Sequence, residues 1–479
     1  MIRPTLPDGL VVFVKRDCAT CVLVEPVLAD LRGRGRKLTV YTQDDPTFPD
    51  SVESVDDTSL ELSWHHDIET VPTVIVVDDG HETTRTVGWD REQWEALVGE
   101  DELGTDLPDW RPGCGSLSVD PDLATGLEVR FGGSVLRSRR VEIAGAEDDW
   151  EALHDRGWSD GLPVVPPTEE RVLRMLQGTT RRPDEVMATV PPDLADCTVE
   201  KIAVNAVLAG CRPEYLPVVI AAVEAACTDE FNMHGLLATT MPTAPVLIVN
   251  GPIRNRIGMN AGINVLGQGN RANSTIGRAL QLVIRNVGGG RPGEVDRATQ
   301  GNPAKLGFCF PEDEEGSPWE SLAVERGFSP EADTVTLFPG EGPRCVVDQL
   351  SRDPHDLTRS LAMNLRATTH PKLAMAFDAI LVISPEHAAR YRDAGWSKAR
   401  FREELDQYLL MDADDMIRGA QGVAEGVPVD FAGSRIPKFR PDGLHIVHAG
   451  SGAGLFSMII GGWVNGEVGS NCVTKEIPT

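Results

Sequence analysis

The N-terminal region contains two neighbouring segments, Gly9-Leu-Val-Val-Phe-Val-Lys15 and Asp17-Cys18-Ala-Thr-Cys21, from which its architecture can be predicted. The apolar run of the first segment predicts a short buried strand, and residues 22–31 have the spacing of a helix. This order places Cys18 at a helix N-terminus, where unpaired backbone N–H groups and the helix dipole stabilise a thiolate. We therefore expect Cys18 to attack and Cys21 to resolve, as a redox-active disulfide.

The following residues complete a small unit that ends near residue 100. A second strand is expected at residues 74–77, directly after Val71-Pro72-Thr73. The dipeptide Asp79-Gly80 is a hairpin turn that leads into a strand at residues 83–87. A helix at residues 90–98 closes the unit.

Taken together, these motifs resemble a thioredoxin-fold domain over residues 1 to about 100. The shared features are the Cys-x-x-Cys after the first core strand, a proline five residues later (Pro26), the Val-Pro-Thr at the position of the family's cis-proline, and Gly88 before the last helix. The resemblance implies that Pro72 is cis and packs against the cysteine pair, where thiol substrates are accepted through adjacent backbone.

Two positions depart from the thioredoxin pattern. Asp17 stands where the family carries a Trp, and Val12 stands where many members bury an Asp. These departures favour a dedicated redox partner over a general-purpose disulfide reductase. A zinc half-site or an inert pair is the alternative interpretation of Cys-Ala-Thr-Cys, although the sequence has no second Cys-x-x-Cys.

Residues 101–148 are expected to form a Gly/Pro-rich linker, with a hairpin at residues 129–141. Gly113 and Gly115 flank Cys114 and leave it sterically open. A thiol on a mobile tether could exchange with the Cys18–Cys21 disulfide and relay electrons. The alternative is a turn that happens to contain a cysteine.

Residues 149–479 alternate helices with buried strands, which predicts a large layered α/β or α+β domain, with a subdivision near residue 316. The expected strands are residues 246–250, 334–338, 379–384 and 444–448. The fold class predicted for the chain is therefore α/β, with a thioredoxin-like domain in front of the large one.

The segment from Asn250 to Arg278 is unusually rich in Gly, Asn and Arg, and it leads into a helix expected at residues 276–287 with Ser274 or Thr275 as its cap. Glycine backbone, amides, guanidinium groups and a helix N-terminus suit an anionic or carboxylate ligand. The alternative is a structural Ω-loop whose Asn side chains satisfy its own backbone. The candidate substrate-binding residues here are Arg254, Arg256, Asn260, Asn270, Arg271, Asn273 and Arg278.

A second candidate is the strand that ends at His448, followed by Ala-Gly-Ser451-Gly-Ala-Gly and an expected helix. Such a turn forms a nest of N–H groups for an anion or oxyanion, with Ser451 in it. His448 is the candidate acid/base group, and a core histidine with satisfied hydrogen bonds is the alternative. Cys472, in Gly-Ser-Asn-Cys-Val-Thr, lies among polar residues, which makes it the cysteine near the C-terminus that we expect to be reactive.

Several phrases of the large region, such as Asp160-Gly-Leu-Pro-Val-Val-Pro-Pro-Thr168 and Gly293-Glu-Val-Asp-Arg-Ala-Thr299, resemble a poorly characterised bacterial family. That family is associated with genes for selenoproteins of the U-G-S-C motif. The similarity covers about residues 150–479 and implies a thiol or selenol redox context, with a redox partner protein, and no particular catalytic residue.

Composition narrows the function classes. A net charge of -28 disfavours binding to nucleic acids and to anionic membrane surfaces. We expect a cytoplasmic protein, because no signal peptide or membrane-spanning run is evident and the nine cysteines are scattered. Nucleotide and flavin fingerprints are missing, so no cofactor is predicted apart from the Cys18–Cys21 disulfide, and no metal. A homodimer is compatible with the sequence.

The leading hypothesis is a thiol-dependent oxidoreductase whose Cys-x-x-Cys domain exchanges electrons with a large domain that binds a small anionic substrate. One alternative is a lyase or hydrolase with an oxyanion site at His448, in which the redox domain maintains a thiol such as Cys472. Another is a scaffold or chaperone that binds a redox partner without catalysis.

Overall fold

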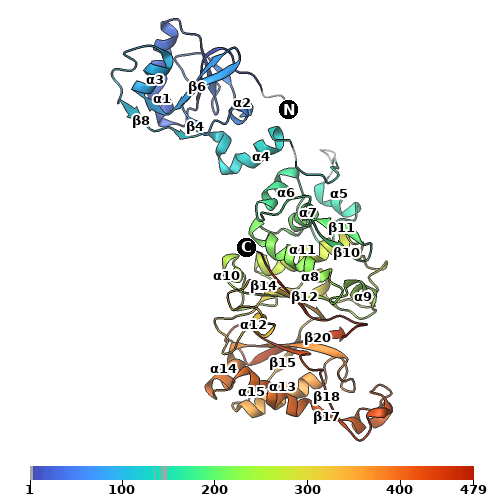
Figure 1. Cartoon of the computed structure of the whole chain (residues 1–479). Coiled ribbons are helices and arrows are strands. Elements are labelled where there is room, and N and C mark those ends of the chain that lie inside the picture. The colour runs from blue at the N-terminus through green and yellow to red at the C-terminus, as the bar shows by residue number, and fades with distance from the viewer. Residues whose placement is uncertain (1–3, 134, 142, 144–147, 479) are drawn as a thin grey trace. The chain divides into compact units, whose positions relative to one another are not determined.

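The computed structural model describes residues 4–133, 135–141, 143 and 148–478 and divides into two compact units, Met1–Arg137 and Ser138–Thr479. Both combine helices with β-sheets, so the chain is of the mixed α/β class (Figure 1). Within the described residues, no helix has both the length and the apolar character needed to cross a membrane. Most of the expected linker, residues 101–148, belongs to the first unit; residues 134, 142 and 144–147 of it lie outside the described residues.

A five-stranded sheet of order β3-β2-β1-β5-β6 forms the centre of the first unit. β1 runs parallel to β2, because the helix between these two strands returns the chain to the same end of the sheet. β1 runs antiparallel to its other neighbour, β5. The apolar run at the start of the chain forms β1, whose residues 10–14 are all buried, and the sequence patterns above do not predict β2 or β3. The strands of this sheet are β1 (Gly9–Val14), β2 (Leu38–Thr42), β3 (Ser54–Asp56), β5 (Thr73–Asp78) and β6 (His81–Val87).

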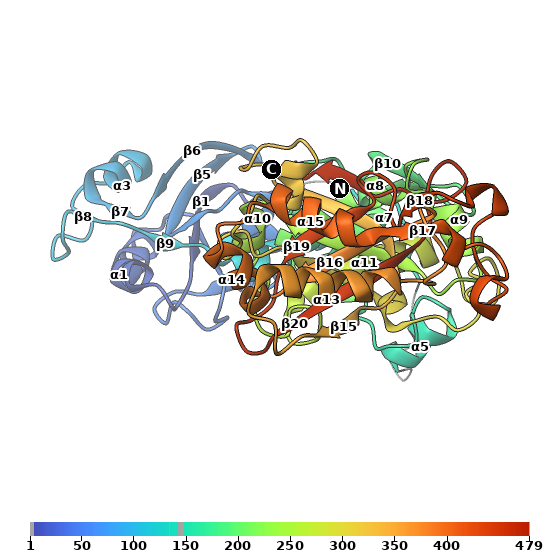
Figure 2. The same cartoon turned by 90° about the horizontal axis from the view of Figure 1, so that it is seen from below.

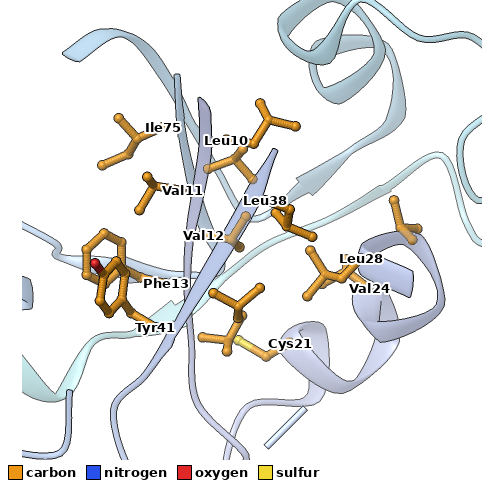
Figure 3. Packing of buried hydrophobic residues seen from close by; sticks show 14 of the residues in the cluster. Leu10, Val11, Val12, Phe13, Cys21, Val24, Leu28, Leu38, Tyr41 and Ile75 are labelled. Carbon is orange, nitrogen blue, oxygen red and sulfur yellow. The ribbon is translucent and has the colours of Figure 1, made fainter. Parts of the chain in front are cut away.

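Helix α1 (Ala19–Gly33) covers one face of this sheet and contains Pro26, as expected (Figure 3). Val12 of β1 points to that side, where Val24 and Leu28 of the helix pack with it in the same core. An apolar residue at position 12 therefore closes the core beneath the cysteine pair. The other helices of the unit are α2 (Glu61–His65), α3 (Arg91–Val98) and α4 (Pro121–Phe131).

The segment after α3 folds back onto the unit as two short strands. β8 (Trp110–Arg111) pairs with β7 (Trp89–Asp90), and β9 (Cys114–Gly115) pairs with β4 (Thr70–Val71). The hairpin expected at residues 129–141 is wrong: its first residues lie in α4, and the described residues after α4 contain no strand in that range. The supposed linker is thus part of the folded unit up to α4.

The second unit is built on an eight-stranded sheet of order β13-β12-β14-β20-β16-β19, with β15 on β20 and β21 on β14. One residue pair, Gly340 with Gly462, joins β14 to β20, so the sheet bends there into two halves. The strands of this unit are β10 (Val186–Val190), β11 (Ala195–Thr198), β12 (Ala244–Asn250), β13 (Cys309–Pro311), β14 (Thr334–Gly340), β15 (Arg344–Val347), β16 (Phe377–Ile383), β17 (Leu410–Asp412), β18 (Arg435–Pro437), β19 (Leu444–His448), β20 (Phe456–Val464) and β21 (Val473–Glu476).

The two halves of the sheet pack face to face between two layers of helices (Figures 1 and 2). Phe338 of β14 and Ile380 of β16 belong to the same buried cluster between the halves. α8 and α11 cover the β12–β14 half, and α13, α14 and α15 cover the β16–β19 half. The helices of the unit are α5 (Asp149–Asp155), α6 (Glu169–Leu176), α7 (Val199–Ala209), α8 (Leu216–Ala226), α9 (Met233–Ala238), α10 (Ile253–Arg256), α11 (Arg271–Asn286), α12 (Leu322–Glu325), α13 (Pro354–Arg366), α14 (Pro385–Asp393) and α15 (Lys398–Leu409).

The strands expected in this region correspond to β12, β14, β16 and β19, and β19 has the expected bounds. The expected cap of α11 is wrong: the helix begins at Arg271 and Asn270 caps it by accepting a hydrogen bond from the Asn273 N–H. The helix expected after the Gly-Ser-Gly-Ala-Gly turn is also wrong, because that turn leads into strand β20. Residues before and after 316 contribute to one sheet, so the unit is not subdivided there.

Candidate functional site

Cys18 is the N-cap residue of α1 and has extended backbone geometry. Its Sγ accepts a hydrogen bond from the Cys21 backbone N–H, with 3.3 Å between sulfur and nitrogen. The Cys21 thiol, the Cys114 side chain and the amides of the first turn lower the pKa of Cys18 to about 5, against the opposing effect of burial. Burial, together with the neighbouring Cys18 sulfur, raises the pKa of Cys21. The first cysteine is therefore a thiolate at neutral pH, and the second is a thiol.

The Val71–Pro72 peptide bond is cis, in agreement with the expectation for Pro72. The Val71 carbonyl oxygen lies 3.5 Å from Cys18 Sγ, and the Pro72 carbonyl accepts a hydrogen bond from the Gly88 N–H at 2.7 Å. This loop therefore forms one wall of the cysteine site.

Cys114 lies directly on this site: its Sγ is 2.8 Å from Cys18 Sγ. That separation falls between the about 2.05 Å of a disulfide bond and an ordinary non-bonded contact. Burial and the adjacent Cys18 sulfur raise the pKa of Cys114. Cys18 is only 3% exposed, whereas Cys114 is partly exposed. Three cysteines, at positions 18, 21 and 114, thus form one cluster.

The segment that carries Cys114 is held in place by backbone contacts on both sides. Thr20 Oγ1 of α1 donates a hydrogen bond to the Pro112 carbonyl at 2.7 Å. In the β4–β9 pair Val71 lies opposite Cys114, and the following residue, Ser116, donates its N–H to the Glu69 carbonyl at 2.9 Å. The expectation of a mobile tether is therefore wrong, because this segment is a paired strand.

Sequence reasoning did not identify Gln43, which holds the end of this strand. Its buried Nε2 donates to Ser63 Oγ at 2.8 Å and to Ser116 Oγ at 2.7 Å, and its Oε1 accepts from the Leu117 N–H at 3.0 Å. A polar residue directly after a strand gives no sequence signal of a partner more than 70 positions away. Thr20 went unnoticed for the same reason.

The four arginines expected to bind an anion are all paired within the second unit. Each guanidinium group hydrogen-bonds to a carboxylate or a backbone carbonyl, and the Arg254 side chain is only 4% exposed. Carboxylates thus compensate the charge of Arg254, Arg256 and Arg278, whereas Arg271 is held by neutral carbonyls. The partners are Glu314 and Glu315 for Arg254, Asp333 for Arg256, the Gly210 carbonyl for Arg271 and Asp160 for Arg278.

The asparagines of this segment bond its own backbone, as the Ω-loop alternative predicts. Asn273 accepts from the Asn260 N–H at 3.1 Å and donates to the Asn260 carbonyl at 2.9 Å. Asn270 donates to the Gly258 carbonyl at 2.8 Å and caps α11. These asparagine side chains thus have hydrogen-bond partners within the segment itself.

The two glycine-rich segments of the second unit do meet, since the Gly450 N–H donates to the Ala261 carbonyl at 2.9 Å. His448, just before this turn, is buried, and its Nδ1 lies 3.0 Å from the Asp313 carbonyl and 3.3 Å from the Asp313 carboxylate. Its Nε2 has no hydrogen-bond partner among the described residues. Ser451 lies in the turn and is partly exposed. The turn that contains Ser451 leads into strand β20, so it does not provide the helix N-terminus that the sequence predicts.

Cys472 is half-buried beside β21 and packs against the cluster between the two sheet halves. Burial raises the pKa of its thiol to about 11, so it is protonated at neutral pH. Its surroundings are therefore less polar than its sequence neighbours indicate. In the described part of the chain, no group of three or more His, Cys, Asp or Glu side chains is arranged to bind a metal ion.

Comparison with known proteins adds no further assignment. No protein-family model matches the chain, and neither a curated protein nor a solved structure matches it. The cluster of Cys18, Cys21 and Cys114 is therefore the candidate functional site.

Proposed function

We propose that the protein is a thiol–disulfide oxidoreductase in which Cys18, Cys21 and Cys114 exchange disulfide bonds within the first unit. The observation that carries the proposal is the 2.8 Å separation of Cys18 Sγ and Cys114 Sγ, on a cysteine whose pKa is lowered to about 5. A low pKa at one sulfur and raised values at the other two are the arrangement that a directed exchange needs.

The exchange is balanced in thiols and protons. The reduced Cys18–Cys114 pair shares one proton and carries one negative charge; with an external disulfide RSSR it forms a Cys18–Cys114 disulfide and releases RS⁻ and RSH. The Cys21 thiol then attacks Cys18. This step forms the Cys18–Cys21 disulfide, and its proton passes to the Cys114 sulfur as that sulfur leaves. RSSR is reduced by two electrons and the Cys18–Cys21 pair is oxidised by two.

The resemblance of residues 1 to about 100 to thioredoxin-fold domains agrees with this proposal. The sheet order β3-β2-β1-β5-β6, the cysteines at the start of α1 and the cis bond before Pro72 support it. Apolar Val12 lies in the core where many thioredoxins bury an Asp, so proton transfer from Cys21 must use another group. The Cys114 sulfur is the group that the geometry offers.

Thiol mapping after redox titration tests the proposal on the full chain. Wild type is expected to form the Cys18–Cys21 disulfide, and Cys21→Ser is expected to accumulate the Cys18–Cys114 disulfide. Cys114→Ser should retain the Cys18–Cys21 disulfide and abolish the Cys18–Cys114 disulfide. Cys345→Ser, at an exposed cysteine of the second unit, is the matched control. If Cys18 stays unmodified by disulfides in every variant, the unit serves as a docking scaffold and the proposal fails.

A wider form of the proposal extends the exchange to a small anionic substrate held by the second unit. Its support is the contact between the segments that carry Ala261 and Gly450. Because three of the four arginines are ion-paired, an anion there would depend on Arg271 and on backbone N–H groups. Isothermal titration with small carboxylates, on wild type and on Ser451→Ala, tests this form.

A second candidate is hydrolysis or lyase chemistry at His448. The observation in its favour is that Asp313 holds Nδ1 of a buried histidine whose Nε2 is left without a partner among the described residues. Turnover that survives Cys18→Ser in the presence of reductant and is lost in His448→Asn would favour this candidate over the first.

A further inference from the structure

The strand edges beside Cys18 are already occupied by the chain itself. β4 pairs with β9, and β7 pairs with β8, so residues 110–115 run past the cysteine site as an added strand. A polypeptide that binds by strand addition needs unpaired backbone N–H and C=O groups. At this site those groups are bonded to the segment from Trp110 to Ser116.

A glycine allows this strand to lie so close. A β-carbon on Gly113 would be 2.4 Å from Thr70 Cγ2 and 2.8 Å from the Val71 carbonyl oxygen. Gly88, on the opposite side, has equally little room, since its β-carbon would be 2.8 Å from the Gly113 nitrogen. At Gly115, in contrast, a β-carbon would meet nothing within 4 Å. The fit at position 113 therefore depends on a missing side chain.

Both ends of the strand are anchored. Before it, Trp89 Nε1 donates to the Pro108 carbonyl at 2.6 Å, and Arg91 pairs with Asp109 at 2.6 Å. After it, Gln43 bonds Ser116 and the backbone of Leu117. The strand of residues 110–115 is thus a fixed cover over the cysteine site.

The cover separates the two reactive sulfurs by accessibility. Cys18 is 3% exposed behind the strand, while Cys114 is partly exposed on it. A small disulfide needs only to reach Cys114, whereas an extended polypeptide would have to replace the strand. Cys114 is thus the first sulfur that a reagent from solution meets.

We propose that the strand of residues 110–115 makes the site specific for low-molecular-weight disulfides and excludes polypeptide disulfides; this inference rests on the proposed function. The Cys18 thiolate takes the proton of Cys114 as the Cys114 sulfur attacks RSSR, which forms a Cys114–SR bond and releases RS⁻. Cys18 then loses its proton to the second leaving group and attacks Cys114, which gives the Cys18–Cys114 disulfide and RSH. Cys21 completes the sequence as described above.

A single-turnover experiment on the pre-reduced full chain tests this specificity without an added reductant. The probes are bis(2-hydroxyethyl) disulfide and insulin, and formation of the Cys18–Cys21 disulfide is followed by acid quenching and mass mapping. We expect wild type to react at least tenfold faster with the small disulfide than with insulin at equal disulfide concentration. Gly113→Ala, which pushes the strand away, should raise the insulin rate at least tenfold, and Gly115→Ala should not.

Cys114→Ser gives a second check that does not depend on how Gly113→Ala folds. It keeps the cover but removes the exposed sulfur, so the rate with the small disulfide should fall at least tenfold. Comparable wild-type rates for insulin and the small disulfide would overturn the inference while leaving the proposed function intact, as would an unchanged rate in Cys114→Ser. No oxidation of Cys18 by either probe would instead contradict the proposed function.

Discussion

Cys18 and Cys21 have opposite pKa shifts although they lie one helical turn apart. The Cys21 side chain and, to a smaller extent, the Cys21 N–H stabilise the charged form of Cys18 at the start of α1, while Cys21 is fully buried one turn later, which favours its neutral form. Backbone N–H groups stabilise charge only at the helix end, and burial disfavours it everywhere else. Position along one turn therefore separates nucleophile from resolving thiol.

The first prediction concerns the cause of the low Cys18 pKa. The Cys21 side chain is the largest contributor, so Cys21→Ala should raise the pKa of Cys18, whereas Cys21→Ser, which keeps a donor, should change it less. Ultraviolet absorbance of the thiolate during a pH titration of the reduced protein measures this. Wild type should show a transition near pH 5 that is absent in Cys18→Ser. A Cys21→Ala titration identical to wild type would show that Cys114 and the backbone stabilise the thiolate without the Cys21 side chain.

The second prediction is a pH-dependent stability of the reduced protein. Between the folded pKa of about 5 and the unfolded pKa of about 8.5, the unfolded state holds a proton on Cys18 that the folded state lacks. The free energy of unfolding of wild type should therefore rise with pH relative to Cys18→Ala, by up to about 1.4 kcal/mol per pH unit. Below pH 5 the free energies of unfolding of wild type and Cys18→Ala should change with pH in the same way.

Above about pH 8.5 the difference between wild type and Cys18→Ala should level off, because Cys18 is then ionised in both the folded and the unfolded state. Burial keeps Cys21 protonated in the folded state of both proteins, so its contribution cancels. Urea unfolding followed by circular dichroism at each pH supplies the free energies. If the difference in free energy of unfolding between wild type and Cys18→Ala does not change from pH 5 to pH 8, Cys18 is not a thiolate in the folded protein.

The third prediction separates a structural from a ligand-binding role for Arg278. Its guanidinium group forms two hydrogen bonds with the Asp160 carboxylate, at 2.8 and 2.7 Å, and both side chains are largely buried. Arg278→Ala should lower the free energy of unfolding by about 2–4 kcal/mol, because a buried carboxylate loses its partner. Arg182→Ala, at an exposed pair with Asp184, should cost less than about 0.5 kcal/mol. A stable Arg278→Ala that fails to bind carboxylates would restore the anion-site hypothesis.

The fourth prediction concerns the bend between the two sheet halves. A β-carbon on Gly340 would lie 2.9 Å from methyl groups of both Ile460 and Val246, on strands of different halves. Gly340→Ala should therefore destabilise the second unit by about 1–3 kcal/mol, through overpacking. Gly452→Ala, where a β-carbon meets open space, is the matched control. Thermal unfolding of the two variants, with equal melting temperatures as the contrary result, checks the prediction.

Local patterns in the sequence were sufficient for part of the fold. The apolar run at β1 and the strand Leu444–His448 could be predicted because consecutive buried residues leave a direct signal. The N-cap position of Cys18 also follows from its neighbours alone. The strand pairing of Cys114 could not be predicted, because its partner Val71 is far away in sequence and two-residue strands have no periodicity.

The glycines around Cys114 illustrate how a correct observation led to a wrong interpretation. Gly113 and Gly115 are expected to leave Cys114 sterically open on a mobile tether, yet Gly113 is the position that lets the strand fit closely. Similarly, the local excess of arginine in the second unit was a true feature of the sequence. Its acidic partners lie far away in the sequence, by 61 positions for Glu315 and Arg254 and by 118 for Asp160 and Arg278, and leave no local trace.

The proximity of Cys18 and Cys114 also has a consequence for chain entropy. A bond between them would close a loop of 96 residues, whereas the Cys18–Cys21 bond closes a loop of a few residues. In the loop-closure model these bonds reduce the entropy of the unfolded chain by amounts worth about 4.7 and about 2 kcal/mol respectively. The transient intermediate of the exchange would thus be the form of the first unit most resistant to unfolding, and each turnover would pass through the most tightly constrained state of the chain.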